Sequence, residues 1–208
     1  EIADRVTVMR AGEVQGVSET KNTSIAELAS QMVGREVFLQ VKKDEAKPEE
    51  EILNVEDLWV HDARGLLAVK GVSLNIRKGE IVGIAGVEGN GQSELVEALT
   101  GLRKTSQGTI NYLGENIASS TPKNIRRKKI AHIPEDRTNT GLNTQLSIWE
   151  NLIGNSYFRK PLSTNGIFNL KKIAQHSNKL KDDFDIRAPN ISLKVKSLSG
   201  GNQQKVVV

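Results

Sequence analysis

A glycine-rich segment that ends in a hydroxyl residue constrains the fold of this chain most. The segment from Gly86 to Ser93 reads Gly-Val-Glu-Gly-Asn-Gly-Gln-Ser, the spacing of a phosphate-binding loop with glutamine in place of the usual lysine. In such a loop backbone N–H groups converge on phosphate oxygens, and the following helix adds its N-terminal dipole. The apolar run at 81–85 before it predicts a buried parallel strand, and residues 93–99 predict the following helix. The sequence therefore predicts a strand–loop–helix unit of an α/β fold.

The glutamine at position 92 changes the chemistry expected of this loop. A lysine there would place a charge on the β- and γ-phosphates of a nucleotide. A hydrogen bond to a charged group contributes about 1.5–3 kcal/mol, so its loss is expected to weaken binding about ten- to a hundredfold. Gln92 can still donate a neutral hydrogen bond, and Ser93 can still bind magnesium. We expect a site that binds nucleotide but hydrolyses it poorly; a glycine-rich turn without a ligand is the alternative. A dinucleotide-binding fingerprint is excluded, because its third glycine position holds Glu94.

A second glycine motif lies near the end of the sequence. Residues 198–205 read Leu-Ser-Gly-Gly-Asn-Gln-Gln-Lys. Two adjacent glycines let the backbone approach a phosphate, and a helix expected to begin near Asn202 would direct its positive end there. Together with the phosphate loop upstream, this motif resembles the signature of ABC-type ATPases. Ser199 as a simple helix N-cap is an alternative that uses the same helix start.

The resemblance extends over nearly the whole chain. The segment 133–137, Ile-Pro-Glu-Asp-Arg, occupies the place of the family's Q-loop, with Glu135 where glutamine is usual. Residues 146–152 look like the stretch that opens the family's helical subdomain. The three motifs together are similar to the second ATP-binding module of the tandem ATPase subunit of bacterial simple-sugar importers, in the branch associated with nucleoside uptake. Trp59 or His61 lies where the family stacks an aromatic ring on adenine, although packing is the interpretation that we favour for either.

The resemblance implies a set of site residues and two cofactors, ATP and Mg²⁺. The implied nucleotide-binding residues are Gly86, Gly89, Asn90, Gly91, Gln92, Ser93 and Glu94. The implied catalytic group is Ser199, Gly200, Gly201 and Glu135, and Ser93 and Glu135 are the implied magnesium ligands. Glutamate in the Q-loop position puts the family's ordinary coordination of magnesium and water in question. In the family, two modules pair head to tail, so the signature here is expected to complete the competent site of a partner module. The loop with Gln92 would form the weaker site.

The expected fold is an α/β P-loop NTPase of ABC type, with an antiparallel β-subdomain and a helical signature subdomain at about residues 142–196. Residues 1–40 are interpreted as the C-terminal end of a first ABC module, because a strand–turn–strand pattern occurs there, followed by a helix that Ser24, with Glu27 three residues later, is expected to cap. Residues 41–51 are charged, lack apolar periodicity and predict a linker. Residues 52–208 are interpreted as a second module, truncated after the signature, and within it the alternating residues 72–76 predict a half-buried strand.

The family resemblance also implies elements that this sequence does not contain. After the signature, the family has an apolar strand ending in Asp-Glu and then a switch histidine, whereas Val206, Val207 and Val208 follow Lys205 here. The chain is therefore expected to be a fragment that does not turn over ATP alone.

Composition narrows the classes of partner. The net charge of +4 is distributed among interspersed acids and bases, and Arg126 to Lys129 is the one basic run, following a helix start at 120–122. Aromatic residues make up only 4%, so a nucleic-acid interface is not expected. The absence of cysteine excludes a disulfide scaffold and agrees with a reducing compartment. The sequence shows no signal peptide and no apolar run near the ~20 residues that span a bilayer. The histidines lack metal-ligand spacing.

The sequence thus predicts an ATP-binding subunit that energises uptake of a sugar or nucleoside from the cytoplasmic face of the cell membrane. Its expected partners are integral-membrane permease subunits, through them an extracytoplasmic solute-binding protein, and another ABC module of the same chain or a second copy. A soluble ABC protein acting on ribosomes or nucleic acid is one alternative, which the short linker disfavours. A regulatory module that binds nucleotide without hydrolysis is the other, and Gln92 favours it for this half.

Overall fold

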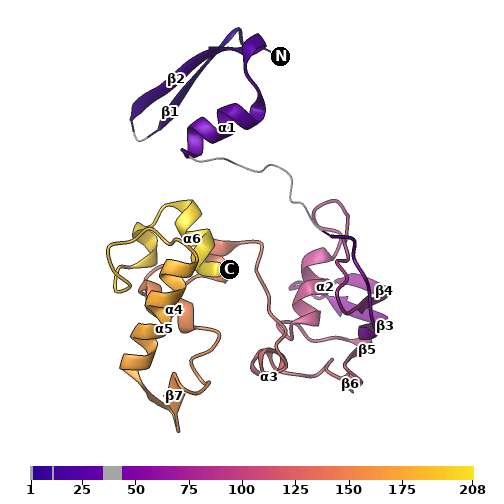
Figure 1. The fold of residues 1–208 in the computed structure, drawn as a ribbon. Helices are drawn as coiled ribbons and strands as arrows, with labels where there is room; N and C mark the ends of the chain where they lie inside the picture. The colour runs from indigo at the N-terminus through magenta and orange to yellow at the C-terminus, as the bar shows by residue number, and fades with distance from the viewer. Residues whose placement is uncertain (1, 11, 35–43) are drawn as a thin grey trace. The chain divides into compact units, whose positions relative to one another are not determined.

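The computed structural model describes residues 2–10, 12–34 and 44–208, which belong to two compact units, Glu1–Lys47 and Pro48–Val208 (Figure 1). The division falls inside the predicted linker, of which residues 41–43 lie outside the described residues, as do 35–40 of the predicted first module. The assignment of the two units to two ABC modules stays a prediction.

The first unit is a β-hairpin followed by a helix. Strands β1 (Arg5–Arg10) and β2 (Glu13–Glu19) pair antiparallel, and η1 (Thr20–Asn22) leads to α1 (Ile25–Val33). The predicted capping box is confirmed: Ser24 Oγ accepts from Glu27 N at 3.2 Å, and Glu27 Oε2 accepts from Ser24 N at 3.4 Å. The helix start was predictable because both partners lie three residues apart in the sequence.

An antiparallel sheet and two helices begin the second unit. The sheet order is β4 (Leu67–Arg77), β3 (Glu51–His61), β5 (Gln107–Tyr112) and β6 (Glu115–Asn116). Helices α2 (Gln92–Leu99) and α3 (Pro122–Arg127) contribute to the core of this sheet. The buried core residues are Val55, Leu58, Val60, Val69, Leu95, Ala98, Ile110, Ile117 and Ile125. The predicted alternating strand at 72–76 lies inside β4.

The buried parallel strand predicted at 81–85 does not form. These residues adopt no strand, and Ile81 and Ile84 are 77% and 52% exposed. A strand needs a neighbour for its backbone N–H and C=O groups. Among the described residues every paired strand is antiparallel, and none pairs with this segment. An apolar run therefore predicts a strand only where a partner strand is at hand.

A second core supports the helices that follow the sheet. The chain passes through η2 (Arg137–Gly141), a single π-helical turn, into α4 (Ile148–Ile153), the hairpin β7 (Ser163–Thr164) and β8 (Ile167–Phe168), and α5 (Leu170–Asp183). It then reaches η3 (Val195–Ser197) and α6 (Gly200–Val207). The buried residues of this core are Leu142, Ile148, Ile186, Val195, Leu198 and Val206. No helix within the described part of the chain is both long and apolar enough to span a bilayer.

Candidate functional site

Two glycines set the backbone of the phosphate-loop segment. Gly89 and Gly91 have φ values of +86° and +95°, a region that side chains disfavour, and Gly91 is the N-cap of α2. A Cβ on Gly91 would lie 2.5 Å from the backbone oxygen of Ala68, so the loop runs against strand β4. A Cβ on Gly89 would meet nothing within 4 Å, so space remains beside that residue. The segment thus ends at a helix N-terminus with an open side, as a phosphate-binding loop requires.

The side chain of Gln92 is turned back into the loop. Its Nε2 donates a hydrogen bond to the backbone oxygen of Val87 at 3.2 Å, and a Cβ on Gly86 would lie 1.8 Å from the same nitrogen. The loop and strand β4 line a cavity of about 660 Å³. Gln92 therefore closes the loop with a neutral hydrogen bond, at the position where a lysine would carry a charge to phosphate.

The two residues predicted to bind magnesium share a second cavity. Ser93 on α2 and Glu135, far along the chain, both line a space of about 420 Å³. No group of three or more histidine, cysteine or acidic side chains that could hold a metal ion occurs in the part of the chain that the structure describes. Mg²⁺ is commonly held by one or two protein oxygens together with substrate phosphates and water. A hydroxyl and a carboxylate in one cavity fit that mode of binding.

Two of the titratable groups that line this cavity have shifted pKa values. Burial lowers the pKa of His132, and Arg126 adds to that effect, while Glu97 opposes it. The pKa of Asp136 is also lowered, chiefly by hydrogen bonds that it accepts from the backbone and side chain of Asn139. At neutral pH the cavity therefore carries a carboxylate at Asp136 and an uncharged imidazole at His132.

The signature turn lies at the start of α6, which begins at Gly200, two residues before the expected start near Asn202. Ser199 is the N-cap by backbone position, but its side chain makes no capping hydrogen bond and instead accepts from Asn202 Nδ2 at 3.0 Å. The Ser199 side chain is therefore not used in capping, contrary to the simple N-cap alternative. Ser199, Gly200 and Gly201 are all exposed, so their N–H groups are accessible at the positive end of the helix.

Arg137 lies near the signature turn, although no role was predicted for it from the sequence. A Cβ on Gly200 would lie 3.0 Å from Arg137 Nη2, and the buried Nε of Arg137 has no hydrogen-bond partner among the described residues. Arg137 lies two residues after Glu135 in the sequence, so the segment that contains the Q-loop position also places a guanidinium beside the signature turn. Only the fold could reveal this contact, because more than sixty residues separate the two segments.

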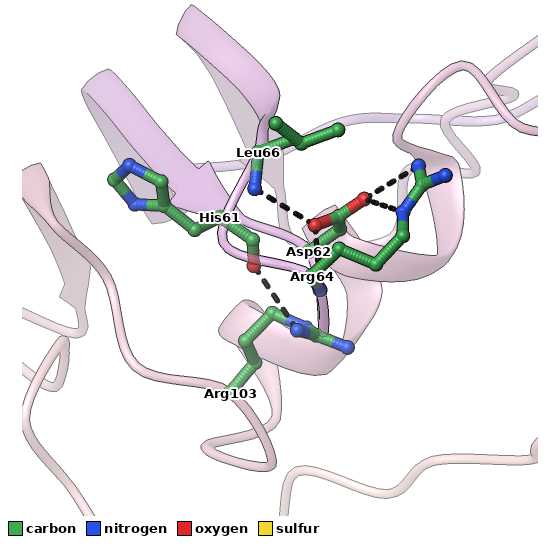
Figure 2. A network of polar contacts seen from close by, with 5 residues as sticks. All are labelled: His61, Asp62, Arg64, Leu66 and Arg103. Carbon is green, nitrogen blue, oxygen red and sulfur yellow. Dashed lines mark hydrogen bonds and ion pairs between the residues drawn. The ribbon is translucent and has the colours of Figure 1, made fainter.

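The turn between β3 and β4 follows His61, one of the two candidates for adenine stacking (Figure 2). Asp62 accepts hydrogen bonds from the backbone N–H groups of Arg64 and Leu66 at 2.8 and 2.9 Å. Arg103 donates to the backbone oxygen of His61 at 3.0 Å, which ties the end of β3 to the segment after α2.

Neither Trp59 nor His61 lines the two cavities that contain loop residues. Trp59 is half-buried and donates from Nε1 to Asp57 Oδ1 at 2.8 Å. This contact agrees with the packing interpretation of Trp59.

Comparison with known sequences gives the same family throughout. The sequence profile described as ABC transporter matches residues 69–208. The chain is 45% identical over its whole length to the guanosine import ATP-binding protein NupO of Bacillus subtilis, of which it covers 41%. It is 41% identical to the nucleoside import ATP-binding protein NupA of Lactococcus lactis, again covering 41% of that protein. A glucose import ATP-binding protein of Haloferax volcanii, TsgD13, is 35% identical, and the chain covers 38% of it.

Comparison with solved structures supports the same fold. The dimeric post-hydrolysis ATP-binding cassette MJ0796, bound to ADP and Pi, aligns with a TM-score of 0.61 at 20% identity, over 75% of this chain and 67% of that one. The cassette cbiO1 of Clostridium perfringens aligns with a TM-score of 0.54 at 25% identity, over 76% of this chain and 60% of that one. The chain therefore has the α/β fold of ABC-type P-loop ATPases, although it spans less than half the length of the curated relatives above.

Proposed function

Because this chain belongs to the ABC transporter family, we propose that it is an ATP-binding part of an importer that takes up a nucleoside or a sugar. Nucleoside is the favoured class, since the two relatives named for guanosine and nucleoside import share 45% and 41% identity, whereas the glucose importer shares 35%. Its proposed partners are permease subunits in the membrane, and through them a solute-binding protein outside. Its proposed place is the cytoplasmic face of that membrane.

The phosphate-loop segment is proposed to bind the nucleotide of the weaker of two sites. The backbone of Gly89, Asn90 and Gly91, with the N-terminus of α2, would receive the phosphates, and Gly86 and Glu94 flank that path. Gln92 would release Val87 and donate a neutral hydrogen bond instead. Ser93 and Glu135 would hold Mg²⁺, which neutralises charge on the phosphates when bound. Without the lysine charge, this site is proposed to bind nucleotide more than it hydrolyses it.

The signature turn is proposed to serve the ATP of a partner ABC module. One observation carries this proposal: Ser199 to Gly201 is an exposed turn at a helix N-terminus whose serine is not used in capping. The N–H groups of Gly200 and Gly201 and the Ser199 hydroxyl would contact the terminal phosphate across the interface. Arg137 beside Gly200 would add positive charge at the same place. Nucleotide would then hold the two modules together at both sites, while hydrolysis proceeds chiefly at the site that this signature completes.

The test compares Ser199→Ala and Ser93→Ala in the intact protein reconstituted with its permease. Ser199→Ala is expected to abolish transport-coupled ATPase activity, whereas Ser93→Ala is expected to lower it less. Ser197→Ala is the matched control, because this exposed serine precedes the turn by two residues and its hydroxyl donates only to the backbone oxygen of Lys194. The control is expected to keep the activity of the unchanged protein.

Binding of a fluorescent ATP analogue separates the two sites in the same variants. Ser93→Ala is expected to weaken binding to this chain's own loop, and Ser199→Ala is expected to leave that binding unchanged. If Ser93→Ala removed ATPase activity more completely than Ser199→Ala, the unequal division between the sites would be wrong. Loss of activity in Ser197→Ala would show that the region tolerates no change and would remove the support from Ser199.

A further inference from the structure

A basic pocket lies between helix α3 and the segment that follows α4, and it shares no lining residue with either cavity that contains phosphate-loop residues. Its volume is about 410 Å³. The charged and aromatic residues that line it are Lys123, Arg127, Tyr157, Phe158, Lys160 and Phe168. None of them has a place in the proposed nucleotide chemistry, so the pocket needs a separate explanation.

Cations surround one aromatic ring at the wall of the basic pocket. Lys123 Nζ lies 5.3 Å from the centre of the Phe158 ring, and the guanidinium carbons of Arg127 and Arg159 each lie 5.7 Å from it. Tyr157 packs edge-on against the same ring at 5.4 Å. Arg159 also donates a hydrogen bond to the backbone oxygen of Arg126. These contacts join α3 to the segment after α4 and gather positive charge at their boundary.

The positive charge at the basic pocket is not compensated by carboxylates. The ion pairs within residues 44–208 include none of the cations at this boundary, which are Lys123, Arg126, Arg127, Arg159 and Lys160. Lys128, next in the sequence, does pair with Glu115. Arg159 lies beside Arg126, since it donates a hydrogen bond to the backbone oxygen of that residue, and burial together with this neighbouring charge lowers the pKa of Arg126. Such a cluster favours an anion that enters from outside.

We propose that the basic pocket binds an acidic segment of a partner protein. A carboxylate of that segment would lie near Lys123 and Lys160. An apolar side chain beside it would cover Tyr157 and Phe168, which are 44% and 45% exposed. Aromatic and arginine side chains that combine an apolar surface with charge are typical of protein–protein contacts. The site goes beyond the proposed ATP chemistry and needs no bound nucleotide.

The shape and contacts of the basic pocket disfavour two other anionic partners. A single-stranded nucleic acid is bound along a groove in which successive bases stack on successive rings, whereas here Phe158 is engaged by cations and by the edge of Tyr157, which leaves Tyr157 and Phe168 as the exposed rings of the pocket. A membrane surface is flat and would be met by a basic stripe with a broad apolar face. A concave pocket of about 410 Å³ instead accommodates a protruding side chain and its neighbours.

The first experiment uses fluorescence anisotropy to measure how tightly this protein binds a fluorescein-labelled peptide of alternating glutamate and leucine. No nucleotide is added. The double variant Lys123→Glu/Lys160→Glu is compared with Lys129→Glu/Lys179→Glu, which makes the same change in net charge at exposed lysines outside the pocket. We expect the pocket variant to bind the peptide at least about tenfold more weakly and the control to change affinity by less than about twofold. Circular dichroism of both variants checks that these surface changes leave the fold intact.

The second experiment locates the bound peptide. The sequence contains no cysteine, so Thr164→Cys at the pocket provides a single site for a bimane label within this chain. A tryptophan placed in the acidic peptide is expected to quench that label. The same label at Gln175, an exposed position of α5, is the control and is expected to keep its fluorescence.

Four results would overturn the proposal. The first three are absence of peptide binding, equal loss of affinity in the two double variants, and quenching at both label positions. The fourth is that vesicles with anionic lipid, or a single-stranded oligonucleotide, bind equally well and lose affinity in the same way when Lys123 and Lys160 are changed. In the last case the pocket would recognise lipid headgroups or nucleic acid instead. Because the peptide experiments do not involve ATP, a negative result in them would not count against the proposed nucleotide sites. A negative result in the ATPase test would likewise not count against the basic pocket.

Discussion

The two glycine motifs of this chain are supported in different ways. The signature turn is continuous with a core in which Val195, Leu198 and Val206 are 0%, 8% and 6% exposed. The phosphate-loop segment follows apolar residues that are largely exposed, and only the helix after it, through Leu95 and Ala98, reaches a core. Motif spacing therefore specifies the local backbone of both turns, whereas their rigidity depends on what packs behind them.

This difference has a physical consequence for how each turn would receive a phosphate. Backbone N–H groups stabilise an anion best when they are already oriented, because orienting them on binding costs conformational entropy. The signature turn is held on both sides by buried residues, so we expect it to be oriented before nucleotide arrives. The phosphate-loop segment is held at its helical end, so we expect its first residues to become ordered on binding.

The largest expected effect concerns the core behind the signature. Ile148 is fully buried, and its replacement by alanine is expected to lower the free energy of unfolding by about 2–5 kcal/mol. Ile84→Ala, at a residue that is 52% exposed, is the matched control and is expected to change it by less than about 0.5 kcal/mol. Urea unfolding measures both. Equal losses would mean that the 81–85 segment is packed as well as the signature core, and the comparison between the two motifs would fail.

The second prediction contrasts two glycines within the phosphate-loop segment. Gly91→Ala is expected to lower the free energy of unfolding by about 2–4 kcal/mol, because φ is +95° and the new Cβ would lie 2.5 Å from the Ala68 oxygen. Gly89→Ala, with φ of +86° and no atom within 4 Å of the new Cβ, is expected to cost about 1 kcal/mol. Thermal unfolding of both variants provides the measurement. A smaller loss for Gly91 than for Gly89 would show that the loop is not held against β4.

The third prediction concerns the charge missing from the loop. Gln92→Lys is expected to raise the affinity for a fluorescent ATP analogue about ten- to a hundredfold, because a neutral donor is replaced by a charged one. Gln92→Met, which removes the donor and keeps a similar length, is expected to lower affinity. Titration of the intact protein with the analogue tests both. An unchanged affinity in Gln92→Lys would mean that the order of the loop, and not its charge, limits binding.

Local sequence rules succeeded where neighbours along the chain decide the structure. The capping box of Ser24 and Glu27 and the strand at 72–76 were correctly predicted, since partners lie three residues apart or alternate along one strand. The strand at 81–85 was wrong, because pairing needs a distant segment. The contact of Arg137 with Gly200 could not be predicted for the same reason, because it joins segments that are distant in the sequence. The basic pocket could not be predicted either, because its cations come from two separate segments. The family and its α/β fold were predicted from the motifs, whereas the roles of the site residues stay predictions.

The smallest expected effect concerns η2, the turn that follows the Q-loop segment and packs against the signature helix α6. Asp136 accepts hydrogen bonds from the backbone N–H groups of Thr138 and Asn139 at 2.8 and 3.0 Å, and so fixes the turn η2. A Cβ on Gly141, the last residue of η2, would lie 3.3 Å from Val207 Cγ2, so this turn packs against the signature helix. These hydrogen bonds lower the pKa of Asp136 below the ordinary value of 3.8.

Because the folded state holds the Asp136 carboxylate ionised, the unfolded chain binds more protons below about pH 4, and stability is lost as the pH falls through this range. Asp136→Asn keeps an acceptor for the turn but does not titrate, so its unfolding free energy is expected to fall less steeply with acid than that of the unchanged chain. Urea unfolding from about pH 7 to pH 3 gives the two slopes. Parallel slopes would mean that η2 is fixed by its packing on α6 and not by this carboxylate, and the link between the Q-loop segment and the signature would then be apolar.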